Sequence, residues 1–156
     1  MKKNKLLRIL LIVLIICTVA FIWSQSCLGK TASSSQSGWV REFLQNMVDT
    51  LGLRIQIEEL VVRKLAHFLE FFVLGLEVTL YGIIGGKPDR NDVLWMPGTV
   101  FLIAFADETI QIFSKRGPAI ADVWLDIAGG VTAMLLVFAL YYLISACKRT
   151  GGKRRG

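Results

Sequence analysis

Residues 63–72 read Arg-Lys-Leu-Ala-His-Phe-Leu-Glu-Phe-Phe and open a long apolar segment. On a helix, Arg63, His67 and Glu70 are four and three residues apart, so all three side chains project from one face. Glu77 extends this polar line a further two turns. An ionisable group inside a membrane costs about 2.5–3.5 kcal/mol on insertion scales, which turns the polar face toward partner groups or a water-filled cavity. We therefore expect partners for this face elsewhere in the chain.

The composition of the chain favours a membrane protein. Its 156 residues are 54% hydrophobic and have a mean hydropathy of +0.56, whereas soluble domains are about 45–50% apolar. Much of the net charge of +6 comes from basic clusters at the two ends of the chain. These clusters flank apolar runs and do not alternate with aromatic residues, which favours an anionic membrane surface over nucleic acid. We expect a lipid bilayer as a partner and no nucleic acid.

The apolar runs predict an all-α fold, a polytopic membrane protein with four transmembrane helices in a single domain, because each run is near the roughly 20 residues that a bilayer requires. The helices are expected at about residues 6–23, 60–84, 93–113 and 121–146 of the domain 1–156. The first run also resembles a signal peptide, but it is long for one and no Ala-x-Ala-like site follows, so we favour a retained helix. The Gly-Gly-Lys-Pro-Asp sequence at residues 85–89 is expected to end the second helix. In the fourth helix, Gly129 and Gly130 permit close helix approach.

A further helix is expected between the first and second spans. Apolar residues recur three and four apart over about residues 39–51, with charged residues between them, so this segment is an amphipathic helix too polar to span. We expect it to lie in the outer interface of the membrane, and packing on the outer ends of the other helices is the alternative that the sequence leaves open. The Ser-rich residues 30–38 predict a flexible connector before it, and Gly52 is expected to end it.

The positions of Lys and Arg orient the helices. Eleven of the 18 lie at the two ends of the chain and between the second and third spans. Because cytoplasmic segments carry an excess of these residues, we expect both termini in the cytoplasm and a multi-pass protein in the cell membrane. Lys64 and Arg116 belong to two basic pairs that lie against the opposite, outer side. We expect local partners to hold them there.

With this orientation, polar residues of all four spans reach the outer end of the bundle. Ser-Gln-Ser at residues 24–26 ends the first span, and Asp107 and Gln111 are one turn apart on the third. Asp122 and Asp126 share the same spacing on the fourth. The ligand-binding residues expected from this convergence are Arg63, Lys64, His67, Glu70, Asp107, Glu108, Gln111, Arg116, Asp122 and Asp126.

Three ordered motifs carry a resemblance to a known family: Arg-Lys-x-x-His-Phe-x-Glu-Phe from Arg63, Asp-Glu-x-x-Gln-x-Phe from Asp107, and Arg116 followed by Asp-x-x-x-Asp-x-x-Gly. Over roughly residues 61–136 the chain resembles the VanZ-like family of small bacterial membrane proteins, whose namesake is associated with resistance to the glycopeptide antibiotic teicoplanin. The resemblance implies a cell-envelope protein of the bacterial cell membrane and an antibiotic-resistance role. Phe71 stands where the family commonly has tyrosine, and at residue 126 both asparagine and aspartate occur.

Three interpretations of the polar residues stay open. In the first interpretation, the polar residues form an interhelical network that fixes the register of the helices. Alternatively, they line an external pocket that binds a glycopeptide or a cell-wall precursor and modulates access of the antibiotic. In the third interpretation, a membrane-embedded enzyme acts on a lipid-linked envelope precursor by acid–base chemistry. Its candidate catalytic residues are His67, Glu70, Asp107 and Glu108. No nucleophile motif such as Gly-x-Ser-x-Gly supports covalent catalysis.

We expect no metal ion and no cofactor. With one histidine in the chain and no Cys/His spacing, a zinc site is disfavoured. A divalent ion held by carboxylates is chemically reasonable, but carboxylates paired with arginine are commoner. That alternative would use Glu70, Asp107, Glu108, Asp122 and Asp126. A proton or ion path is disfavoured because only Glu77 among the carboxylates lies deeper, and we expect it to be hydrogen-bonded inside the bundle.

Overall fold

The computed structural model describes residues 2–27, 30–52, 56–84, 86, 88–113 and 120–153. Within these residues the chain forms helices and no strand, which confirms the all-α fold class. The helices are α1 (Lys2–Cys27), α2 (Lys30–Thr50), α3 (Glu59–Ile83), α4 (Arg90–Phe113) and α5 (Ile120–Lys153).

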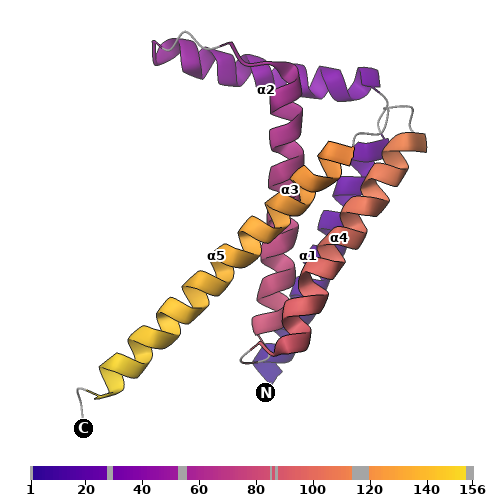
Figure 1. The fold of residues 1–156 in the computed structure, drawn as a ribbon. Coiled ribbons are helices and arrows are strands. Elements are labelled where there is room, and N and C mark those ends of the chain that lie inside the picture. Colours follow the sequence, from indigo (N-terminus) through magenta and orange to yellow (C-terminus); the bar gives the residue numbers. More distant parts are fainter. Residues whose placement is uncertain are drawn as a thin grey trace.

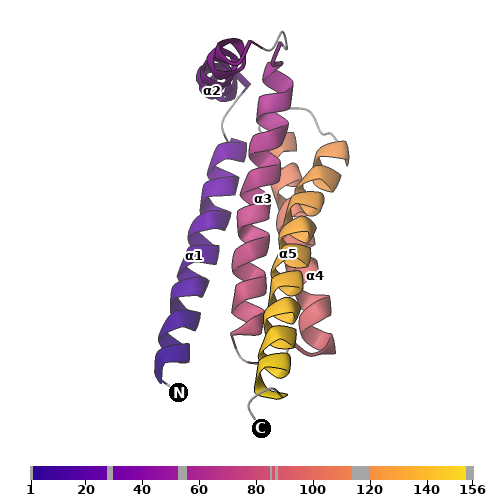
Figure 2. The ribbon, with the colours of Figure 1, turned by 90° about the vertical axis from the view of Figure 1, so that its left-hand side faces the viewer.

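Four of these helices are long and apolar enough to cross a membrane, as predicted. The candidate spans are Lys5–Cys27, Glu59–Ile83, Asn91–Phe113 and Ala121–Lys148. They form a bundle in which α3 contacts each of the other four helices, so the stretch with the polar face belongs to the central helix. Figures 1 and 2 show both ends of the chain at one end of the bundle.

Helix α2 lies across the other end of the bundle, above the start of α3 (Figure 1). The structure corrects the prediction of a flexible connector over residues 30–38, because α2 begins at Lys30. That segment has no proline and no glycine before Gly38, so nothing in its backbone chemistry opposes a helix that the following amphipathic turns already stabilise. The end is as predicted: Gly52 adopts the left-handed φ of 72° that glycine tolerates.

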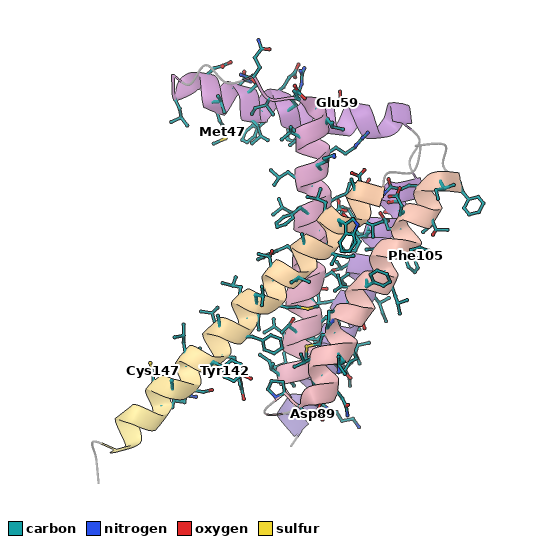
Figure 3. All side chains as sticks on the ribbon, in the orientation of Figure 1. Met47, Glu59, Asp89, Phe105, Tyr142 and Cys147 are labelled. Atoms are coloured by element: carbon teal, nitrogen blue, oxygen red, sulfur yellow. The ribbon has the colours of Figure 1, made fainter. Side chains whose placement is uncertain are left out.

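The apolar stripe of α2 is not covered by the bundle. Trp39 is 71% exposed and stacks on Phe43, and Met47 and Leu51 continue the exposed stripe. Met47 lies on the side of α2 from which α3 descends (Figure 3). This arrangement is the one expected of a helix whose apolar side dips into a membrane interface.

The closest helix contact joins α3 to α5 and depends on glycine. A Cβ atom added at Gly75 would collide with the backbone of Gly130, and one added at Gly129 would collide with the carbonyl oxygen of Phe68. Without side chains at these positions the two backbones approach directly, as glycine pairs allow in membranes. The close-approach surface predicted at Gly129 and Gly130 is therefore confirmed.

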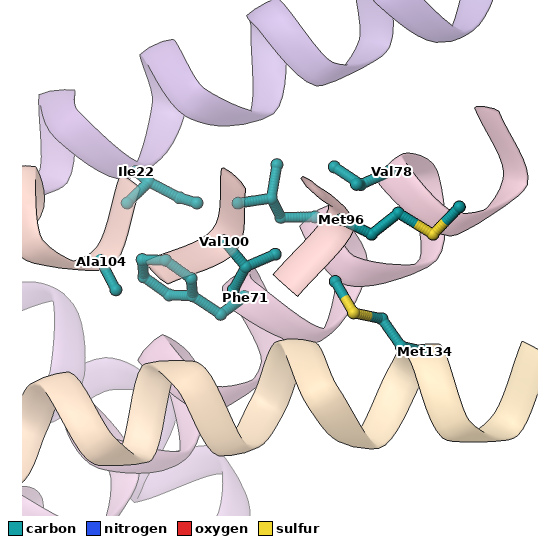
Figure 4. Close-up of a cluster of buried hydrophobic side chains, with 8 residues drawn as sticks. Ile22, Phe71, Val78, Met96, Val100, Ala104 and Met134 are labelled. Carbon is teal, nitrogen blue, oxygen red and sulfur yellow. The ribbon is translucent and has the colours of Figure 1, made fainter. Parts of the chain in front are cut away.

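The apolar core is shared by all four spanning helices (Figure 4). Ile22 of α1, Phe71 of α3 and Met96 of α4 pack with Met134 of α5, and the first three are fully buried. Phe71, which replaces the tyrosine common in the resembled family, therefore contributes its ring to the core.

The turn between α3 and α4 lies at the same end as the termini, where Figure 3 labels Asp89. Gly86 has a φ of 135°, which favours glycine. Asp89 and Asp92 cap α4 reciprocally, since the backbone N–H of each donates to the carboxylate of the other at 2.9 Å. Helix α3 ends at Ile83, just before the Gly-Gly-Lys-Pro-Asp sequence, so the predicted end of the second span is confirmed.

Candidate functional site

His67 and Glu70 occupy the half of α3 that lies nearer to α2. The distance from Nδ1 of His67 to Oε2 of Glu70 is 3.7 Å, and the two side chains are 15% and 18% exposed. This distance is too long for a hydrogen bond, so the contact is electrostatic. The i, i+3 spacing on α3 is what brings the two groups to one face.

The third span brings a fully buried carboxylate to the same level. Asp107 is 0% exposed, and its Oδ2 accepts a hydrogen bond of 2.8 Å from Nε2 of Gln111, one turn further along α4. The same amide nitrogen lies 3.5 Å from Oγ of Ser26, which is also fully buried. Gln111 therefore links Asp107 to the polar end of α1. The other Asp107 oxygen, Oδ1, has no hydrogen-bond partner.

The first turns of α5 supply two further carboxylates. Asp126 is 1% exposed, and its Oδ1 has no hydrogen-bond partner. Asp122 is less buried and lies 3.4 Å from Nζ of Lys64 on α3. Among the residues that the structure describes, Lys64 is the basic residue that forms an ion pair with one of these two aspartates. Asp122 is thus a local partner for Lys64, as the sequence analysis expected.

The three helices converge on one point. A ring nitrogen of His67 and one carboxylate oxygen each of Asp107 and Asp126, all atoms that can bind a metal ion, lie within 4.8 Å of one another. The charges of Glu70, Glu108 and Asp122 also act on Asp126. We call the five carboxylates Glu70, Asp107, Glu108, Asp122 and Asp126 the acidic cluster, with His67 at its centre.

An apolar groove of about 400 Å³ lies beside the acidic cluster, between α4 and α5. Phe105 and Ile112 line it from α4, and Trp124 and Ile127 line it from α5. Glu108 also lines the groove, although this side chain is only 7% exposed. The groove thus connects the apolar exterior of the bundle with the acidic cluster.

The other residues expected at the site have different surroundings. Arg63 is half-buried on α3, and Arg116 lies outside the described residues. Ser24 is exposed and donates to the carbonyl of Phe21 in its own helix at 2.7 Å, so it does not reach the cluster. Glu77 lies deeper and accepts a hydrogen bond of 3.0 Å from Oγ1 of Thr18, which confirms the prediction of a hydrogen-bonded carboxyl inside the bundle.

Two features escaped the sequence analysis. The groove was not foreseen, although Phe101 and Phe105 stand one turn apart on α4 and could have signalled an aromatic wall. The contact of Ser26 with Gln111 was also missed, because a serine at the end of a span is common and its spacing carries no information about a partner 85 residues away.

Comparison with protein families finds one model, VanZ/LLP1, that matches residues 6–143. Neither the curated proteins nor the solved structures that were searched contain a match to the chain. The family match contains the second and third candidate spans in full, most of the first and fourth, and all five residues of the acidic cluster.

Proposed function

We propose that this chain, which belongs to the VanZ/LLP1 family, is a cell-membrane protein that binds the polar head of a lipid-linked cell-wall precursor at the acidic cluster. The observation that carries the proposal is the apolar groove that Glu108, a buried member of the cluster, also lines. A lipid-linked precursor has the same two parts, an apolar chain and a polar head.

The groove supports a lipid over a soluble ligand. Its volume of about 400 Å³ falls in the range of ligand sites, about 300–1,000 Å³. Aromatic and aliphatic side chains line it, among them Phe105 and Trp124, which are 60% and 68% exposed. In a membrane this surface faces acyl chains, so an isoprenoid or acyl chain enters it without leaving the apolar phase.

The charge distribution supports an outer position for the cluster. Both termini, with their basic residues, lie at the end of the bundle opposite to α2. The positive-inside rule then places the termini in the cytoplasm and the acidic cluster at the outer leaflet, where a lipid-linked precursor is exposed to glycopeptides. A protein that holds this precursor changes how a glycopeptide such as teicoplanin reaches it, which gives a route to antibiotic resistance.

The enzymatic alternative rests on His67. This imidazole lies 3.7 Å from Glu70 and beside two buried carboxylates, a setting in which a histidine can move a proton in a reaction of the bound head group. If the protein is an enzyme, His67→Asn and Glu70→Gln each abolish product formation outright, whereas in a binding protein the same variants weaken binding of the precursor by degrees. A binding protein forms no product at all.

The test uses the full chain in nanodiscs and a fluorescent lipid-linked cell-wall precursor. Ile112→Trp fills the groove, and Leu102→Trp is the matched control, since Leu102 lies on α4, is 66% exposed and does not line the groove. We expect Ile112→Trp to weaken binding about tenfold, which corresponds to about 1.4 kcal/mol, and the control to bind like the wild type. Product analysis of the same samples separates binding from catalysis. Equal binding by all three proteins, or by protein-free nanodiscs, overturns the proposal.

A further inference from the structure

We propose that His67, Asp107 and Asp126 form a binding site for a divalent first-row metal ion, Mn²⁺ or Zn²⁺. The sequence alone favoured no metal, because it suggested arginine partners for the carboxylates. The metal site itself rests on the geometry described above, whereas its role in holding a precursor rests on the proposed function.

The spacing of the three side chains fits a metal ion. Their ligand-type atoms lie within 4.8 Å of one another and come from three different helices, α3, α4 and α5. A metal ion bound at about 2.0–2.2 Å holds its ligand atoms about 3–4 Å apart, close to the spacing found here. Sites of this kind in helical bundles are typically built from inward-facing side chains on neighbouring helices.

The burial of the two aspartates points to a bound cation. Asp107 and Asp126 are 0% and 1% exposed, and each has one carboxylate oxygen, Oδ1, without a hydrogen-bond partner. A buried carboxylate oxygen is normally hydrogen-bonded, paired with a cation or bound to a metal. The hydrogen bond from Gln111 to Oδ2 of Asp107 fixes the carboxylate and leaves Oδ1 for an ion, as the supporting shell of a metal site does.

The local charge also favours a dication. Glu70, Glu108 and Asp122 add negative charge around Asp126. Lys64 pairs with Asp122, and among the described residues no lysine or arginine forms an ion pair with Asp107 or Asp126. Two buried carboxylates and a neutral imidazole balance one divalent ion.

The ligand types select the class of metal. Carboxylates suit Mg²⁺, Ca²⁺ and Mn²⁺, while imidazole suits Zn²⁺, Fe²⁺, Cu²⁺ and Ni²⁺, so a mixed set favours Mn²⁺ or Zn²⁺. Glu70 lies 3.7 Å from Nδ1 of His67, where a carboxylate can orient a metal-binding imidazole. Three protein ligands leave at least one position of the ion open, and an oxygen of a phosphate head group fits that position.

The experiment measures metal binding by the purified full chain in the absence of any precursor. Chelator-treated protein is titrated with Mn²⁺ while the electron paramagnetic resonance signal of free Mn²⁺ is recorded, and Zn²⁺ is added in competition. We expect one ion per chain and displacement of Mn²⁺ by Zn²⁺. Asp107→Asn and Asp126→Asn each remove a ligand and are expected to weaken Mn²⁺ binding at least about tenfold. Glu77→Gln is the control, because Glu77 is a carboxylate of the same bundle that bonds to Thr18, and it should bind like the wild type.

Wild-type protein that binds no stoichiometric ion overturns the metal site, as do asparagine variants that bind Mn²⁺ like the wild type. If an asparagine variant fails to fold, the wild-type stoichiometry and its increase in melting temperature with added Mn²⁺ decide the question. If the proposed function is wrong but the metal site is right, the protein binds Mn²⁺, and nanodiscs that contain the protein bind no precursor with or without Mn²⁺. Precursor binding that is equal in chelator and in Mn²⁺ shows that the metal ion does not hold the precursor, and it contradicts neither the metal site nor the proposed function.

Discussion

Asp107 and Asp126 are the residues that set this bundle apart from one held together by packing alone. A polar network that only fixes helix register satisfies its own hydrogen bonds, because an unpaired buried polar group costs about 1–3 kcal/mol. Here each aspartate keeps an oxygen without a hydrogen-bond partner in a buried position. Such local costs are typical of functional sites, where stability is given up for binding.

Gly75 gives a prediction about stability. Gly75→Ala adds a Cβ atom that would collide with the backbone of Gly130, so α3 and α5 must separate, and we expect a loss of about 1–3 kcal/mol. Gly98→Ala is the matched control, because a Cβ atom at this helical position meets nothing within 4 Å. Thermal unfolding in detergent should show a lower melting temperature for Gly75→Ala only. Equal melting temperatures for the two variants would mean that the α3–α5 contact is looser than described.

Among the helices, α3 was the best predicted and α2 the least. The 3.6-residue period determines which side chains share a face of α3, and the sequence therefore located His67 and Glu70 together. The start of α2 was wrong because weak local propensities over residues 30–38 do not decide between helix and loop. The partners of the polar face could not be predicted in this way, because they depend on the distance and the angle at which the helices cross. The pairing of Lys64 on α3 with Asp122 on α5 is an example.

Helix α2 carries a prediction about the membrane interface. A protein whose other tryptophans, Trp23, Trp95 and Trp124, are replaced by phenylalanine reports on Trp39 alone. Because Trp39 belongs to the exposed apolar stripe, we expect blue-shifted emission in bilayers and quenching by brominated lipids. The control moves the probe to the polar side of α2 by combining Trp39→Phe with Arg41→Trp, which should emit as in water. Fully aqueous emission from Trp39 would refute the interfacial position.

The whole molecule is a bundle with different ends. One end has the termini and the turn at Asp89, and the other has α2 and the start of α5, whose first turns carry Asp122 and Asp126 of the acidic cluster. The sequence predicted the four spans. It also predicted that polar residues meet at one end of the bundle, and it named all five residues of the acidic cluster among them. It did not predict the groove, because the distance between α4 and α5 depends on how the two helices pack, and no periodicity in either helix encodes that distance.

The orientation of the bundle in the membrane predicts which introduced cysteines react from outside the cell. In a chain whose three native cysteines are replaced by alanine, Gln56→Cys should react with a membrane-impermeant maleimide on intact bacterial cells. Asp89→Cys should react only after permeabilisation, because the basic termini lie at its end of the bundle. The reverse pattern would place the acidic cluster in the cytoplasm and would remove the proposed contact with glycopeptides.

Two explanations of the acidic cluster, a binding site and a network that only stabilises the fold, predict different changes in the melting temperature of the variant Asp126→Asn. Asp126→Asn keeps the shape of the side chain and removes a carboxyl group whose ionisation burial and four other carboxylates oppose. If the cluster exists to bind a ligand, this variant in chelator melts at the same temperature as the wild type or about 2–4 °C higher, while metal and precursor binding are lost. A melting temperature that falls by several degrees in chelator, with binding unchanged, would show instead that Asp126 serves the fold and that the cluster is no binding site.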